Sequence, residues 1–265
     1  MGALDGFTES TFDHDGVTRP VWRSGSGPAV VVITEIPGIT PDVAEFARRV
    51  IDVGCTAVLP TLFGAPGREP TAGYTASSLA RACVSREFAT WAVGRTSPIT
   101  GWLKALARHE HGVCGGPGVG VVGMCLTGGF ALAMMVDPVV AAPVLSQPSL
   151  PFALTARHKR DVNLTAEDLA AVKARCRAEP DLCVLGLRFS GDRLAPAERF
   201  TRLRDELGDS FIGVEIDSSK GNPHRIKSSA HSVLTEELVD EPGHPTRDAL
   251  DQVLEHLSVR LLERR

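Results

Sequence analysis

The chain has 265 residues and a formal net charge of -4, with 43% hydrophobic and 23% charged residues. This balance excludes extensive disorder, and the lack of a basic stripe argues against nucleic acid as a partner. The length suits a single α/β unit, so we expect residues 1–265 to form one domain.

Neither a signal peptide nor a membrane span is expected from the sequence. Met1–Ser10 carries Asp5 and Glu9 and has no apolar run, which does not fit a secretory signal. Gly112–Val136 is uncharged but rich in glycine, and a buried strand followed by a buried helix explains it better than a lipid-facing helix. The six cysteines form no C-x-x-C pair, which together with the missing signal predicts reduced thiols and a cytoplasmic location. No H-E-x-x-H motif or paired Cys/His spacing appears, so we expect no metal, and we expect no other cofactor.

The hydrophobic pattern predicts strands that alternate with helices. Two β-like runs, Phe7–Phe12 and Val17–Trp22, flank the turn dipeptide Asp15-Gly16 and predict an N-terminal hairpin. Further strands are predicted at Ala29–Thr34, Cys55–Leu59, Val119–Val122, Val139–Leu145, Cys183–Ser190 and Phe211–Asp217. Helices are predicted at Pro41–Val53, about Ser77–Ala92, Ile99–His109, Thr127–Val136 and about Thr246–Glu263. This order indicates an α/β fold, with a mostly parallel central sheet and helices on both faces.

The segment Ser149–Glu179 is longer than a minimal crossover between two strands. It contains a helix start at Asn163–Glu167, where Thr165 is the expected capping residue. From its length alone, we expect residues 149–179 to act as a partial lid.

The most informative segment is Val121–Phe130, in which a predicted strand runs through Gly123 into Cys125 and then into a glycine-rich helix start. This pattern is typical of a nucleophile elbow, a sharp turn between strand and helix that exposes one side chain. A thiol at that place lies at a helix N-terminus, which favours the thiolate. The backbone N–H of Leu126 would face a developing oxyanion.

Two other interpretations compete for this segment. Cys125 could be a buried structural cysteine in a glycine-rich turn, which is the usual place of a free thiol. Gly118–Gly123 also matches the dinucleotide pattern G-x-G-x-x-G, but its apolar run lies inside the motif and a loop precedes it, contrary to what a nucleotide site requires.

An acid and a base for the nucleophile are available later in the chain. Asp192 follows the predicted strand Cys183–Ser190, at the sheet edge where sites of α/β proteins lie, although it could also form a turn or a helix cap. Among the later histidines, His231 lies in a loop at a suitable distance before the last helix, and His224 is the second choice. A histidine in a loop is often only solvated. Cys125, Asp192 and His231 therefore indicate a catalytic site mainly as a set.

Taken together, these motifs resemble the dienelactone hydrolase family, α/β-hydrolases that use cysteine where most relatives use serine. The resemblance spans nearly the whole chain and is carried by Thr34–Gly38 (Thr-Glu-Ile-Pro-Gly), Gly123–Gly129 (Gly-Met-Cys-Leu-Thr-Gly-Gly), Ser-Gly-Asp192 and Ala-His231-Ser. It implies an α/β-hydrolase fold and a catalytic triad of Cys125, Asp192 and His231.

The resemblance also implies roles for two residues after the first buried strand. Glu35 matches the family's glutamate that contacts the resting thiol and helps control its activation, and the N–H of Ile36 would be the second oxyanion donor. From sequence physics alone, Glu35 would be a solvated residue at a strand end.

The sequence departs from the family pattern at two positions. Thr127 stands where many members have glycine. Thr235 stands where the family's archetype has an arginine that helps to hold the substrate carboxylate, and Arg68 or Arg193 could replace that arginine. The second departure puts the dienelactone substrate in question more than the chemistry.

The sequence therefore predicts a hydrolase of small-molecule esters or lactones that acts as a monomer or small homo-oligomer. An alternative is a non-catalytic or redox-sensing protein in which Cys125 is reversibly oxidised. That alternative has no obvious resolving cysteine, because the nearest in sequence, Cys114, lies eleven residues away.

Overall fold

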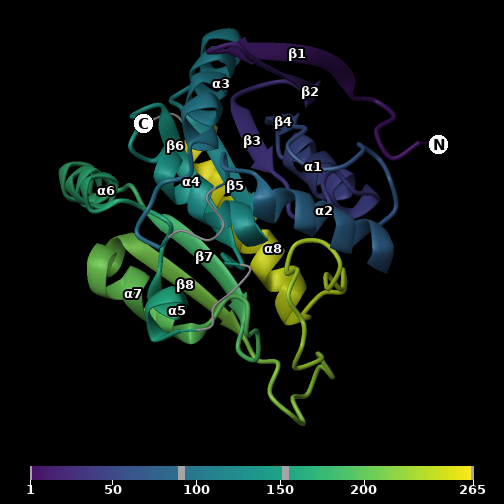
Figure 1. Cartoon of the computed structure of the whole chain (residues 1–265), viewed down its shortest axis with the longest axis vertical. Helices are drawn as coiled ribbons and strands as arrows, with labels where there is room; N and C mark the ends of the chain where they lie inside the picture. Colours follow the sequence, from purple (N-terminus) through teal and green to yellow (C-terminus); the bar gives the residue numbers. More distant parts are fainter. Residues whose placement is uncertain (1, 89–92, 151–154, 264–265) are drawn as a thin grey trace.

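The computed structural model describes residues 2–88, 93–150 and 155–263, and it is built around one eight-stranded sheet (Figure 1). The strands are β1 (Thr8–His14), β2 (Val17–Gly25), β3 (Ala29–Ile33), β4 (Thr56–Pro60), β5 (Val119–Met124), β6 (Val140–Ser146), β7 (Val184–Phe189) and β8 (Phe211–Ile216). Their order in the sheet is β1-β2-β4-β3-β5-β6-β7-β8. β1 pairs antiparallel with β2, and β2 with β4, whereas all other neighbours are parallel.

The predicted N-terminal hairpin is confirmed. Asp15 and Gly16 both have positive φ, 52° and 74°, as a two-residue type I′ turn between twisted strands requires. The pairing runs from Thr8 opposite Arg23 to His14 opposite Val17. The hairpin therefore extends the parallel sheet along one edge.

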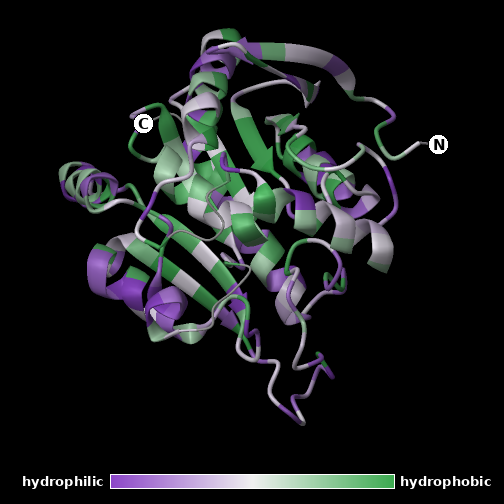
Figure 2. Ribbon diagram, viewed as in Figure 1, coloured by the Kyte–Doolittle hydropathy of each residue, from purple (hydrophilic) through white to green (hydrophobic). Residues whose placement is uncertain are grey.

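Helices cover both faces of the sheet. They are α1 (Pro41–Asp52), α2 (Ala72–Val84), α3 (Ile99–Cys114), α4 (Gly128–Met134), α5 (Ala156–Arg160), α6 (Ala166–Ala178), α7 (Ala197–Leu207) and α8 (Pro245–Leu261), with short 3₁₀ turns η1 (Cys125–Thr127) and η2 (Gly208–Ser210). Along β3, Val31 and Ile33 pack into a core with α3 and α4, while Val30 and Val32 pack into a second core with α1 and α8. This alternation follows from the two-residue period of a strand, and it confirms a sheet that is buried on both sides (Figure 2).

The register of the central strands brings the segments of the site together. Ile33 of β3 lies opposite Gly123 of β5, and Met124 of β5 lies opposite Ser146 of β6. Because these strands are parallel, the residues that follow each of them emerge at the same edge of the sheet.

The strands and three of the helices lie within three residues of their predicted bounds, but two predicted helices need correction. The helix predicted at about Ser77–Ala92 runs from Ala72 to Val84, because the Thr71 hydroxyl caps it and Ser85 leaves it in an extended conformation. Residues 89–92 of that prediction lie outside the described residues. The helix predicted at Ile99–His109 continues to Cys114 and stops at Gly115, whose φ is 69°.

The sequence interpretation missed α7 altogether. This helix buries Phe200, Leu203 and Leu207 and presents charged residues on its other side, so its apolar stripe is narrow (Figure 2). The uncharged segment Gly112–Val136 forms the end of α3, then β5, η1 and α4, as expected. No helix within the described residues is long and apolar enough to cross a membrane.

The excursion after β6 contains α5 and α6. Its helix start is confirmed, since the Thr165 hydroxyl accepts a hydrogen bond from the Asp168 N–H at 3.1 Å. α5 packs against α7, and α6 packs against α4 and α7. Residues 151–154 of this excursion lie outside the described residues, and a role as a lid stays a prediction.

Candidate active site

Cys125 lies on a strained turn between β5 and the helical segment η1–α4. Its φ is 57°, in the left-handed region that a side chain other than glycine rarely adopts. The turn needs a small residue before it, because a Cβ on Gly123 would lie 2.2 Å from the Thr127 carbonyl oxygen. The buried Thr127 hydroxyl accepts the Met124 N–H at 2.8 Å and lies 2.7 Å from the Ile33 carbonyl oxygen, which ties the turn to the end of β3. This is the geometry of a nucleophile elbow.

The structure brings His231 and Asp192 together. His231 Nδ1 lies 2.7 Å from Asp192 Oδ2, and the other carboxylate oxygen accepts the Leu194 N–H at 2.8 Å. Only 3% of the Asp192 side chain is exposed. A Cβ on Gly191 would lie 2.7 Å from the Ser228 carbonyl oxygen, so the glycine lets the acid loop and the histidine loop approach closely.

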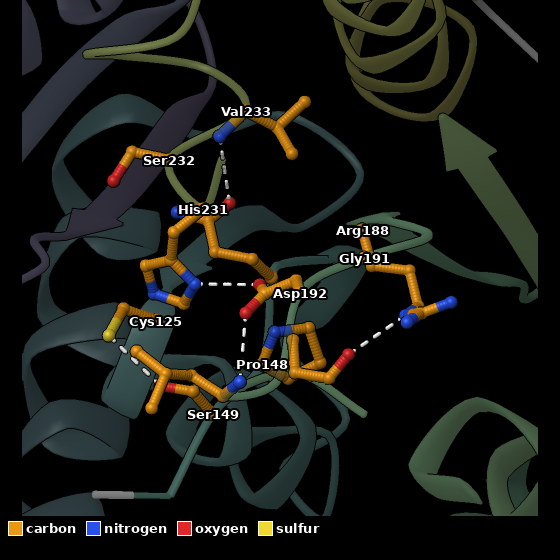
Figure 3. A network of polar contacts seen from close by, with 12 residues as sticks. Cys125, Pro148, Ser149, Arg188, Gly191, Asp192, His231, Ser232 and Val233 are labelled. Atoms are coloured by element: carbon orange, nitrogen blue, oxygen red, sulfur yellow. Dashed lines mark hydrogen bonds and ion pairs between the residues drawn. The ribbon is translucent and has the colours of Figure 1, made fainter. Parts of the chain in front are cut away.

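The second ring nitrogen of His231 is directed toward Cys125. Nε2 is buried and makes no hydrogen bond of good geometry within the described residues, and Figure 3 shows the Cys125 sulfur on that side of the ring. Burial opposes the charged imidazolium, but the neighbouring Cys125 and Asp192 outweigh it and raise the pKa of His231 well above its ordinary value. The imidazole is therefore suited to take the proton of the thiol.

A residue that sequence reasoning missed contacts the sulfur itself. Ser149 Oγ lies 2.9 Å from Cys125 Sγ, and the Ser149 N–H donates to the Cys125 carbonyl oxygen at 2.9 Å (Figure 3). Ser149 follows β6, the sheet neighbour of β5, and 4% of it is exposed. The available signal was this position after the carboxyl end of a neighbouring strand.

The two expected oxyanion donors follow neighbouring strands, Leu126 after β5 and Ile36 after β3. The N–H of Leu126 belongs to the first turn of η1, where no helical carbonyl can accept it. Ile36 follows β3 and packs, like Cys125, against the same apolar core. Their role as oxyanion donors stays a prediction.

A model of the dienelactone hydrolase family matches residues 16–175, which is more than half of the chain. The chain belongs to the dienelactone hydrolase family. Membership places it among hydrolases of the ester or lactone class, and the eight-stranded sheet agrees with the α/β-hydrolase fold.

Solved structures of related enzymes share this fold at low sequence identity. A dienelactone hydrolase from Anabaena variabilis superposes with a TM-score of 0.59 at 16% identity, over 97% of this chain and 99% of that one. A dienelactone hydrolase-like promiscuous phosphotriesterase from metagenomic libraries gives 0.61 at 16% identity, over 96% and 98%. A cold-adapted esterase from an Arctic intertidal metagenomic library gives 0.57 at 16% identity, over 97% and 95%. A comparison with curated proteins finds no match.

Glu35, expected to gate the thiol, is held by other residues. Its carboxylate accepts hydrogen bonds from Ser232 Oγ at 2.7 Å, from Gln147 Nε2 at 3.2 Å and from the Thr235 hydroxyl. No hydrogen bond joins it to Cys125 within the described residues. Thr235, which replaces the arginine of the family's archetype, thus binds the glutamate, and gating by Glu35 stays a prediction.

The arginines expected to replace that family arginine are both exposed. Arg68 stacks over the Tyr74 ring at 4.1 Å from its centroid. Arg193 follows Asp192 directly in the chain. The described residues show no contact between either guanidinium and the triad, so their part in substrate binding stays a prediction. The second-choice histidine, His224, packs against the His244 ring at 5.1 Å.

A buried arginine that sequence reasoning did not select lies close to the site. Arg199 of α7 is 1% exposed and donates to four backbone carbonyl oxygens. They belong to Asp161 at 2.6 Å, Pro148 at 2.6 Å, His158 at 3.0 Å and Leu194 at 3.2 Å. The cation thereby joins the excursion after β6 to the loops that carry Ser149 and Asp192.

No group of three or more His, Cys, Asp or Glu side chains within the described residues could hold a metal ion. The dinucleotide-like pattern Gly118–Gly123 mostly forms β5 itself rather than a loop that opens a helix. The pattern therefore lacks the helix start that would bind a pyrophosphate.

Proposed function

We propose that this member of the dienelactone hydrolase family cleaves an ester or lactone through an acyl-cysteine intermediate, with Cys125 as nucleophile, His231 as base and Asp192 as the residue that orients the base. The observation that carries the proposal is the 2.7 Å contact between His231 Nδ1 and Asp192 Oδ2, with the buried Nε2 directed at the thiol. Three groups in this relation are the elements of nucleophilic acyl transfer.

In the first half-reaction, His231 Nε2 takes the thiol proton and Cys125 Sγ attacks the carbonyl carbon. The new carbon–sulfur bond moves the carbonyl electron pair onto oxygen, and the N–H groups of Leu126 and Ile36 stabilise that oxyanion. When the intermediate collapses, the carbon–oxygen bond to the alcohol breaks, and the alkoxide takes the proton from His231.

In the second half-reaction, water replaces the alcohol. His231 removes a proton from the water as its oxygen attacks the thioester carbonyl, and the carbon–sulfur bond then breaks. The products are a carboxylic acid and the restored thiol. For a lactone, alcohol and acid belong to one molecule, so ring opening is the net result.

The substrate is expected to differ from the dienelactone of the family's archetype, because Thr235 stands in place of its carboxylate-binding arginine. We also propose a cytoplasmic location, which the reduced thiols expected from the sequence would fit.

The experiment is hydrolysis of a small panel, an activated aryl ester and several unsaturated lactones, by the wild type and by Cys125→Ala. We expect activity that disappears in the variant while its circular dichroism stays unchanged. Equal rates in both proteins would remove Cys125 from the mechanism. The order of rates over the panel would define the substrate class.

A further inference from the structure

The hydroxyl of Ser149 contacts the nucleophilic sulfur, and the described residues show no other hydrogen bond to this hydroxyl. Its Oγ lies 2.9 Å from Cys125 Sγ. A serine hydroxyl carries one proton to donate, and a thiolate carries none. Once the thiol proton has moved to His231, this contact has only one possible direction, from Ser149 to the sulfur.

The peptide unit that precedes Ser149 is fixed at both of its ends. Its own N–H donates to the Cys125 carbonyl oxygen at 2.9 Å, and the preceding carbonyl, that of Pro148, accepts from Arg199 at 2.6 Å. A Cβ on Gly128 would lie 2.7 Å from Pro148 Cβ, so the segment also packs tightly against the start of α4. The hydroxyl is therefore held beside the sulfur by backbone contacts.

Other groups that could serve the thiolate are engaged elsewhere or act differently. The Glu35 carboxylate is occupied by Gln147, Ser232 and Thr235. The charged groups that act on the sulfur are His231 and the buried Arg199. Arg199 uses its described hydrogen bonds on backbone carbonyls, so Ser149 is the described side chain with a hydrogen bond to this sulfur.

We propose that Ser149 is a catalytic residue that donates a hydrogen bond to the Cys125 thiolate and so stabilises the charged form of the nucleophile before attack. The bond is weakened as the carbon–sulfur bond forms, because the negative charge then moves from sulfur to the carbonyl oxygen. This role rests on the proposed thiol chemistry, and it makes Ser149 a direct partner of the resting nucleophile in this chain.

When Ser149 is replaced by alanine, we expect the curve of Cys125 alkylation rate against pH to cross the curve of the wild type. Removal of a hydrogen bond to a charged group disfavours that group, so we expect the midpoint of thiol alkylation to rise by about one pH unit. Well below the midpoint, the variant has about tenfold less thiolate than the wild type. Its more basic thiolate is about threefold more nucleophilic, so the net rate of alkylation is about threefold slower than in the wild type. Well above both midpoints the variant alkylates about threefold faster.

The test measures iodoacetamide alkylation of Cys125 against pH, with the Cys125 peptide quantified by mass spectrometry because three other thiols are also partly exposed. Ser149→Thr and Ser149→Val form the matched pair, since they share a shape and differ in the hydroxyl. We expect the threonine variant to follow the wild type and the valine variant to follow Ser149→Ala. Ser97→Ala, which removes another buried hydroxyl with one backbone hydrogen bond, should leave the curve unchanged.

Coincident curves for the wild type and Ser149→Ala, or for the threonine and valine variants, would overturn the proposal, even if hydrolysis were slower. Should the alanine variant fail to fold, the threonine and valine pair decides. Alkylation needs no substrate, so its result is separate from the proposed function, which is decided by hydrolysis with Cys125→Ala.

Discussion

Replacement of Arg199 by leucine is expected to lower the free energy of unfolding by about 3 kcal/mol or more, although the arginine lies outside the triad. The guanidinium is 1% exposed and binds four backbone carbonyls, which belong to three separate segments around the site. Leucine fills part of the space but removes the described donor of the Asp161, Pro148 and Leu194 carbonyls, while the His158 carbonyl keeps the Asp161 N–H at 3.2 Å.

The magnitude follows from two opposing terms. Burial lowers the pKa of the Arg199 guanidinium to about 10, only partly offset by Asp161, Asp192 and Cys125. For a base with a depressed pKa, the cost of the charge is fully present below pH 10, and the drop corresponds to about 3 kcal/mol. Four hydrogen bonds from a cation contribute about 6 kcal/mol at the lower end of their usual range. The bonds outweigh the burial cost by about 3 kcal/mol.

The assay is urea-induced unfolding followed by circular dichroism at neutral pH. Arg199→Lys should lose less stability than Arg199→Leu, because it keeps the charge. It should still be less stable than the wild type, because all its donors lie on one nitrogen. Arg202→Leu, on the same helix, removes a half-exposed partner of Glu206 and should cost less than about 1 kcal/mol. An Arg199→Leu protein within about 0.5 kcal/mol of the wild type would refute the reasoning, since the carbonyls that lose their donor would then not need one.

Three further predictions concern the acid, the elbow and a buried histidine. Asp192→Asn should reduce kcat by about 10³–10⁴-fold in steady-state kinetics, because the amide cannot stabilise the imidazolium, and a loss below tenfold would contradict this. Gly123→Ala should cost more than about 2 kcal/mol in urea unfolding, since its Cβ would lie 2.2 Å from the Thr127 carbonyl oxygen, and wild-type stability would show that the turn can relax. Burial lowers the pKa of His256 to about 4 from 6.5, so the folded state holds it neutral while the unfolded chain binds the proton. Stability should therefore fall by up to about 3 kcal/mol as the pH drops from 6.5 to 4, and an equal fall in His256→Gln would exclude this cause.

Turns and helix caps that depend on the local sequence were predicted well. The turn at Asp15-Gly16, the cap at Thr165 and the elbow at Cys125 each depend on a few neighbouring residues with a specific backbone preference. The pairing of Asp192 with His231 was expected from the order of residues along the chain, together with the resemblance to the family.

Features that depend on distant contacts were missed. Ser149 and Arg199 are ordinary residues in sequence, and only the register of β5 and β6 and the packing of α7 bring them to Cys125. The hydrogen bonds of Thr235 and Gln147 to Glu35 join positions 200 and 112 residues apart. Neither the hydrophobic periodicity nor the spacing of motifs in the sequence predicts such contacts, because they arise from the fold as a whole.

The central claim is an acyl group on Cys125, and the most direct measurement is a search for it. The wild type is mixed with an activated acetate ester, quenched in acid within the first turnover, digested and mapped by mass spectrometry. The account predicts an acetyl group on the Cys125 peptide that neutral hydroxylamine removes, as it does a thioester, and that is missing from Cys125→Ala. An acetyl group on Ser149, or turnover with Cys125 unmodified at every time point, would contradict the account.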